Sequence, residues 1–221
     1  MTLLRQIQCL LERTYTPSGV NLEDFIVGSS RAEQLACLAG VQDIPADGRV
    51  FLRKTDDDLR LAVYFSSSTI QRLENDHPLE TLGDRNIRPF ITFIEEINHA
   101  LHAILLFHEG QREISSESFL SNLELQGKID TWLVLKHFVS RGSGKPVLGR
   151  RHKKWLEEWL FERETFDYPD KTLARRYREA NRIGRRFVRH LEKCRGDERI
   201  RLIRELRPMP YPRKKEFILS A

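Results

Sequence analysis

The residues best suited to chemistry lie together in the segment from Phe90 to His99, which reads FITFIEEINH. Glu95 and His99 are four positions apart, so a helix places them side by side on one face. Glu96 is adjacent and is a candidate general base. Most other positions of this segment are apolar, which indicates a helix covered on both sides. We therefore expect a partly buried carboxylate–imidazole pair.

A second helical segment, near residues 118–139, mixes apolar and polar residues in the same way. Leu125, Ile129 and Trp132 form its main apolar stripe, while Asp130 and His137 fall on the reverse side. Two helices joined by a short connection are usually antiparallel neighbours, and ligands on facing helices are typical of divalent metal sites. We expect the polar groups of the two helices to converge. The candidate metal ligands are Glu95, His99, Glu124, Asp130 and His137, and the candidate catalytic base is Glu96.

The first of these helices is similar in part to two known metal motifs. Zincin metalloproteases carry H-E-x-x-H; here Glu95 stands in place of the first histidine, and Glu124 follows in a later helix, as the third ligand does in one zincin branch. Glu96-Ile97-Asn98-His99 also matches the E-x-x-H unit of di-iron bundles, which need two copies. A divalent metal is thus a candidate cofactor without a complete motif. The alternative is an ion pair with only a structural role.

Positive charge is concentrated in the last third of the chain. Residues 1–140 hold 13 Lys and Arg against 20 Asp and Glu, a net charge of −7, whereas residues 141–221 hold 24 against 12, a net charge of +12. A dense basic cluster is followed by arginines at three- and four-residue steps, which form a stripe on one helix face. Guanidinium groups bind phosphates in a bidentate manner. The candidate polyanion-binding residues are Arg150, Arg151, Lys153, Lys154, Arg175, Arg178, Arg182, Arg185 and Arg189.

This basic region has two alternative interpretations. Nearby glutamates, or the acidic first part of the chain, can pair with the arginines internally, and a charge run is often only a solvated face. No helix-turn-helix, zinc-finger or aromatic RNA-binding signature occurs in the sequence. If nucleic acid is bound, we expect contacts to the phosphate backbone rather than sequence-specific reading of bases.

The elements that must position these residues indicate an α+β fold that is predominantly α-helical. Alternating apolar residues predict strands at 49–54 and 59–65, which form an antiparallel hairpin across Asp56-Asp57-Asp58. A short strand is expected within 22–27. The helical pattern dominates from Asn86 onward, and the proline-rich end from Pro208 to Pro212 predicts an extended tail. Helices are expected at 3–14, 31–38, 87–108, 118–139, 151–164, 170–195 and 197–206.

Length and composition are those of a globular protein: 221 residues, 40% hydrophobic and 31% charged. We divide the chain into an acidic α+β part at 1–140, with two long packed helices, and a basic, bundle-like helical part at 141–221; the two can form one continuous domain. The linker 141–146 separates them. Three distant cysteines support neither a disulfide framework nor a cysteine zinc site, which favours the cytoplasm. No secretory or membrane-spanning segment is expected.

Three functional hypotheses follow. The first is a non-enzymatic adaptor or regulatory subunit that contacts a protein partner through its acidic part and a polyanion through its basic helices. The alternative is a metal-dependent hydrolase, or a degenerate zincin-like protein, with a Glu/His/Asp site between two helices. The third is an assembly component that oligomerises through its long helices. We rank the adaptor first because it requires no missing catalytic residue.

Overall fold

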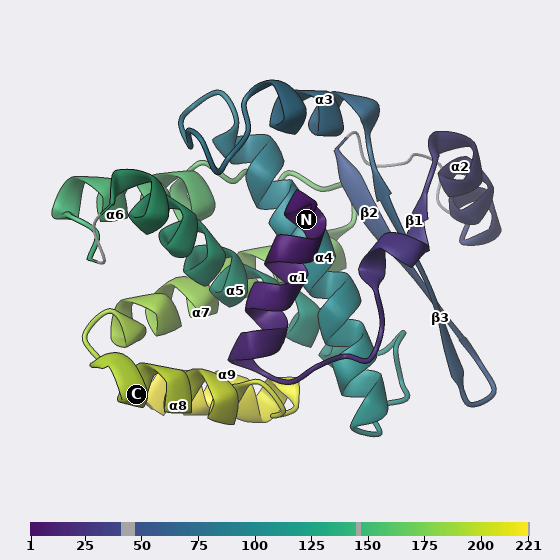
Figure 1. Ribbon diagram of the computed structural model, residues 1–221. Helices are drawn as coiled ribbons and strands as arrows, with labels where there is room; N and C mark the ends of the chain where they lie inside the picture. The colour runs from purple at the N-terminus through teal and green to yellow at the C-terminus, as the bar shows by residue number, and fades with distance from the viewer. Residues whose placement is uncertain (41–46, 145–146, 221) are drawn as a thin grey trace.

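The computed structural model describes residues 1–40, 47–144 and 147–220, and it has an α+β architecture dominated by helices, as predicted. Two long central helices are flanked by a small sheet on one side and by the C-terminal helices on the other (Figure 1). In chain order the elements are α1 (Leu3–Thr14), η1 (Leu22–Phe25), β1 (Ile26–Val27), α2 (Ser29–Leu38), β2 (Gly48–Thr55), β3 (Asp58–Phe65), α3 (Ser67–Asn75), α4 (Ile87–His108), α5 (Glu117–Ser143), α6 (Arg150–Glu157), η2 (Glu158–Glu162), α7 (Lys171–Leu191), α8 (Gly196–Leu206) and α9 (Tyr211–Ser220).

The sheet is mixed and has the strand order β1-β3-β2. β2 and β3 form the predicted antiparallel hairpin, with Val50 opposite Val63 and a turn in which Asp56 has φ 46°. β1 pairs with β3 in the parallel direction, with Ile26 opposite Val63. The predicted hairpin was therefore only part of the sheet. The short strand expected within 22–27 is present as β1, but its parallel pairing with β3 was not predicted, because side-chain alternation within a strand does not indicate which strand lies beside it.

α4 and α5 form the centre of the protein, and both are buried on more than one side. Ser116 caps α5 by accepting a hydrogen bond from the backbone N–H of Phe119. The helix ends at Gly144, whose φ of 65° suits glycine. α5 thus continues into the predicted linker, whose Lys145 and Pro146 lie outside the described residues.

α4 is also long and apolar enough to cross a membrane, by length and composition alone. Of its most apolar stretch, 72% is buried inside the protein. A core helix of a soluble fold has the same property, so this feature is weak evidence for a membrane span.

The C-terminal end differs from the predicted extended tail. Residues Tyr211–Ser220 form the helix α9, with Pro212 in its first turn. Proline is tolerated there because the first N–H groups of a helix have no acceptor within the helix. The prediction of an extended tail was wrong because Pro208 and Pro210 precede a helix and Pro212 lies in its first turn, so no proline interrupts it.

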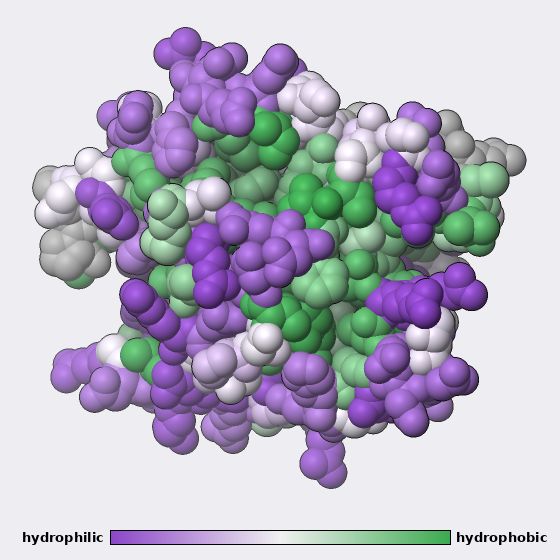
Figure 2. All heavy atoms as spheres, turned by 45° about the vertical axis from the view of Figure 1, so that its right-hand side comes forward, coloured by the Kyte–Doolittle hydropathy of each residue, from purple (hydrophilic) through white to green (hydrophobic). Residues whose placement is uncertain are grey.

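Apolar side chains form one large buried cluster that extends from α1 through α4 and α5 to α6 and α7. A second cluster joins α5, α7, α8 and α9. Figure 2 shows one face of the molecule, on which apolar side chains gather in the middle and hydrophilic side chains surround them. α5 packs against both α4 and α7, and it therefore connects the sheet side with the C-terminal helices.

Candidate functional site

The packing of α4 on α5 brings His99 against Gly127. A Cβ atom at Gly127 would lie 2.9 Å from Nε2 of His99, which is closer than two such atoms approach. Glycine at this position therefore provides the space that the imidazole ring occupies. The residue that permits this contact lies in the middle of a helix, where glycine is otherwise unfavourable.

His99 lies between two carboxylates. Its Nε2 atom is 3.5 Å from Oε2 of Glu124, and its Nδ1 atom is 4.0 Å from Oε2 of Glu96. The three side chains are only 12–16% exposed. Burial raises the pKa of Glu96 to about 7, with further contributions from the negative charges of Glu124 and Glu95, while His99 opposes the shift. Burial also raises the pKa of Glu124. Glu96 therefore takes up a proton near neutral pH.

Glu95 takes part in a different contact from the one predicted. Its Oε1 atom accepts a hydrogen bond of 2.8 Å from Nζ of Lys128, and the same ammonium lies 2.9 Å from Oε2 of Glu164. The Lys128 side chain is only 5% exposed. Burial alone would lower the pKa of Lys128, but the two carboxylates outweigh it and the pKa is raised. A protonated amine thus compensates negative charge within the helix pair.

Asp130 belongs to a separate buried hydrogen-bond network. It accepts hydrogen bonds from the Tyr15 hydroxyl, from Nδ2 of Asn98 at 2.6 Å and from Nε2 of Gln126 at 3.1 Å. Nζ of the fully buried Lys214, from α9, donates to Oε1 of Gln126 at 2.7 Å. Burial raises the pKa of Asp130 to about 6 and lowers the pKa of Lys214 to about 7. This network ties α1, α4, α5 and α9 together.

His137 does not meet the other predicted ligands. Its side chain is exposed, and its ring lies edge-on to Phe138. It follows Glu124 by thirteen positions in α5, which corresponds to roughly 20 Å along a helix. Burial lowers the pKa of His137, and Arg141 adds to this effect.

The predicted ligands are therefore divided among four places. Within the part of the chain that the structure describes, no group of three or more His, Cys, Asp or Glu side chains has the arrangement of a metal site. Glu96, His99 and Glu124 are the subset that the fold brings together.

Two of the five arginines of the predicted stripe on α7 form ion pairs with glutamates. On α7, Arg185 pairs with Glu157 and Glu162, and Arg189 also pairs with Glu157. Lys153, on α6, pairs with Glu192. The glutamates of α6, η2 and α7 thus interrupt the stripe, and each exposed pair of this kind contributes little stability.

The other predicted basic residues remain on the surface. Arg178 is exposed, and its guanidinium lies 5.9 Å from the ring centre of Phe166. The remaining five are exposed and make no ion pair with any residue that the structure describes: Arg150, Arg151, Lys154, Arg175 and Arg182.

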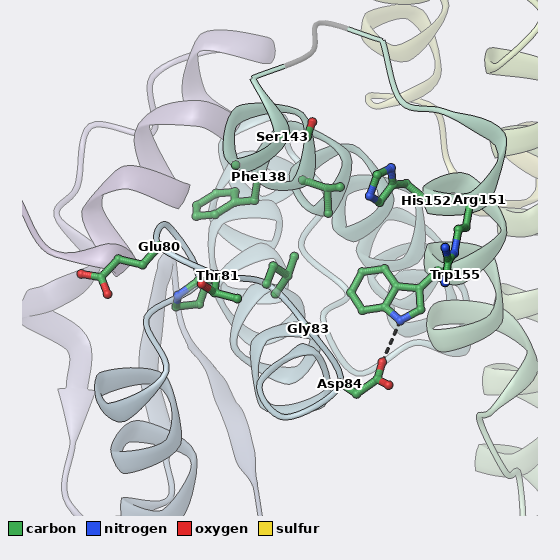
Figure 3. Close-up of a pocket in the computed structure, with 13 residues that line it drawn as sticks. Glu80, Thr81, Gly83, Asp84, Phe138, Ser143, Arg151, His152 and Trp155 are labelled. Atoms are coloured by element: carbon green, nitrogen blue, oxygen red, sulfur yellow. Dashed lines mark hydrogen bonds between the residues drawn. The ribbon is translucent and has the colours of Figure 1, made fainter.

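An open cleft of about 650 Å³ lies beside the basic helix α6. The loop before α4 forms one wall, the end of α5 another, and Arg151, His152 and Trp155 of α6 the third (Figure 3). Nε1 of Trp155 donates a hydrogen bond of 2.8 Å to Oδ1 of Asp84 in the loop. Nε1 of Trp159 donates to the same oxygen at 3.2 Å.

Sequence reasoning missed three residues that organise these sites: Lys128, Lys214 and Trp155. Lys128 had one available signal, since it stands four positions after Glu124 on a helix with apolar residues on both faces. Trp155 directly follows the basic cluster of α6, but nothing in the sequence places it opposite Asp84. Lys214 lies in the segment that we expected to follow an extended tail.

Comparisons of the chain with protein-family models, with curated proteins and with solved structures gave no match. The function must therefore be inferred from the site itself. What the fold defines is a small α+β protein with two buried polar networks at its centre and an open cleft beside the basic helix α6.

Proposed function

We propose that this protein is a non-enzymatic adaptor or regulatory subunit that binds a polyanionic partner through the exposed cations of α6. The observation that carries the proposal is a cluster of unpaired cations on α6. Arg150, Arg151 and Lys154 lie within five positions, are exposed and have no ion pair among the described residues. Unpaired cations on one short helix attract a chain of phosphates.

The central polar groups favour binding over catalysis. Lys128 occupies the space between Glu95 and Glu164 and supplies the positive charge that a metal ion would bring to such carboxylates. The carboxylate of Asp130 already accepts hydrogen bonds from three side chains and is therefore satisfied within the protein. The open cleft lies at α6, not at His99. We assign these central groups to the stability of the helix pair.

The acidic first part of the chain is proposed to contact a protein partner, as expected from its net charge of −7. The three cysteines Cys9, Cys37 and Cys194 are free thiols. Free thiols are usual in the reducing cytoplasm, which is the location that we propose.

A salt titration tests the polyanion contact. Fluorescence anisotropy with labelled single-stranded and double-stranded nucleic acids should detect binding at low salt, with an affinity that falls steeply as the salt concentration rises. Replacing Arg150, Arg151 and Lys154 together by glutamine should weaken binding. The slope of log K against log salt should fall by about 2 for a single strand, since each lost phosphate contact contributes roughly 0.7.

A matched control exists on the hairpin. Arg53, Lys54 and Arg60 are also exposed, and their replacement by glutamine changes the net charge by the same amount. This control should retain the affinity and the salt slope of the unmodified protein. An equal loss in both triple variants would show that only net charge matters, and no binding at low salt would refute the proposal.

A metal-dependent hydrolase, or a degenerate zincin-like protein, is the second candidate because Glu96, His99 and Glu124 lie together. In this reaction class the metal would polarise the substrate, and Glu96, with its raised pKa of about 7, would accept a proton. Titration calorimetry with zinc tests this candidate. Zinc binding that disappears in His99→Ala would support it, and the absence of zinc binding at neutral pH would exclude it.

A further inference from the structure

The cleft beside α6 has an aromatic wall with a fixed position. Trp155 lines the cleft, and the hydrogen bond from its Nε1 to Asp84 holds the edge of the indole against the loop before α4. Phe138, from the end of α5, lines the cleft as well (Figure 3). Tryptophan and phenylalanine rings are platforms on which the bases of single-stranded nucleic acids stack.

The cleft also has a suitable size and mixed polarity. Its volume of about 650 Å³ falls within the range of sites that hold small organic molecules. Besides its aromatic and aliphatic walls, the cleft offers the Thr81 and Ser143 hydroxyls and the His152 ring. His152 lies between Ser143 and Trp155, facing the same space (Figure 3). These groups can both donate and accept hydrogen bonds, so the cleft favours no particular base.

The charges around the cleft complement a phosphate backbone. Arg151 lines the cleft, and the exposed residues Arg150 and Lys154 lie on the same helix. Arg141, at the end of α5, is exposed as well. Oδ1 of Asp84 accepts hydrogen bonds from the indole N–H groups of Trp155 and Trp159. Glu80, the other acidic residue of the lining, extends away from the other labelled side chains (Figure 3).

From this geometry we propose that the cleft receives one unstacked base of a single-stranded nucleic acid, while the cations of α6 hold the neighbouring phosphates. The inference rests on the proposed polyanion binding and deepens it, because it names a single strand as the ligand. A duplex keeps its bases paired and stacked, so it offers the cleft no ring. An acidic peptide would match the charges but would leave the aromatic wall without a stacking partner.

The experiment compares strands that differ only in their bases. Anisotropy is measured at low salt with a labelled oligothymidylate and with an abasic strand of the same length and charge. The unmodified protein should bind the oligothymidylate about fivefold or more tightly than the abasic strand, which is the lower limit expected for stacking of one base. A duplex of equal length should bind no more tightly than the abasic strand.

Variants at Trp155 test the role of the ring. Trp155→Leu keeps an apolar side chain but should lower the affinity for oligothymidylate to that for the abasic strand. Trp155→Phe retains an aromatic ring and should keep most of the preference for oligothymidylate over the abasic strand. Because both variants lose the indole but only the leucine variant loses the aromatic ring, the comparison separates loss of stacking from loss of folding. Trp159→Leu is the control. Trp159 donates a hydrogen bond to the same oxygen of Asp84 but does not line the cleft, so this variant should keep the unmodified protein's preference for oligothymidylate over the abasic strand.

The possible results separate this inference from the proposed function. Equal affinity for the oligothymidylate and the abasic strand would overturn the base site while leaving polyanion binding intact. Binding of neither strand would refute the proposed function itself. Displacement of the oligothymidylate by polyglutamate of equal charge, at equal concentration, would overturn the inference in favour of an acidic protein partner.

Discussion

Replacement of Lys128 by methionine would test whether the buried ammonium stabilises the helix pair. Methionine has a similar volume and no charge, so Glu95 and Glu164 would lose a partner at 2.8 and 2.9 Å. Removing one member of a buried ion pair costs about 3–5 kcal/mol. Because the two glutamates are 20% and 21% exposed, water can solvate part of the freed charge, and we expect about 3 kcal/mol, the lower end of this range.

The assay is urea denaturation followed by circular dichroism at pH 7. The free energy of unfolding should fall by about 3 kcal/mol, and the melting temperature by roughly 6–12 °C for a chain of this size. Replacing Glu95 and Glu164 by glutamine in the same variant should recover part of the lost stability.

Lys136→Met is the matched control. Lys136 pairs with Glu192, but Glu192 keeps Lys153 as a second partner, so we expect a loss of only about 1 kcal/mol. If Lys128→Met costs no more than this control at pH 7, charge compensation by Lys128 does not stabilise the protein.

Three further predictions follow from the two central networks. Burial raises the pKa of Glu96 to about 7, so the contribution of this residue to stability is lost as the pH rises from about 4.5 to 7. Glu96→Gln should therefore flatten the curve of unfolding free energy against pH in this range and add up to about 3 kcal/mol at pH 8. A curve parallel to that of the unmodified protein would contradict this prediction. Gly127→Ala should destabilise the protein by about 1 kcal/mol, since the clash with His99 exceeds the gain in helix propensity. In the His99→Ala background the same substitution should instead stabilise the protein in a thermal melt. A destabilisation that persists without the imidazole would refute the clash. Burial lowers the pKa of Lys214 to about 7, so above that pH the unfolded chain binds more protons than the folded protein does. The free energy of unfolding should therefore rise by up to about 1.4 kcal/mol per pH unit between pH 7 and 9. In urea titrations Lys214→Met should lack this rise, and a rise that persists in the variant would belong to another group.

Local patterns predicted much of the architecture. The helices α4 and α5 follow from apolar residues that recur at helical spacing, and the β2–β3 hairpin follows from alternation across the aspartate-rich turn. Helical spacing also limited the carboxylates that can reach His99, but we predicted Glu95, four positions before it, whereas Glu96, three positions before it, is the one that lies near the imidazole. Features of this kind depend on residues that are near one another in the chain.

The partners of the polar residues could not be predicted in the same way. Asp130 accepts a hydrogen bond from Tyr15, and Gln126 accepts one from Lys214, so both partners come from the ends of the chain. Lys128 is neutralised by Glu95 and Glu164, which belong to different segments. No periodicity within one helix indicates which distant group will face it.

What the sequence by itself determined is the set of elements, the uneven distribution of charge and the list of residues able to do chemistry. Tertiary structure decided which of these residues are exposed. It paired Arg185 and Arg189 with glutamates, and it left Arg150 and Arg151 on the surface beside an aromatic cleft. The physical reason is that the environment of a charge depends on the groups within a few ångströms of it, and in a folded chain most of those groups are distant in sequence.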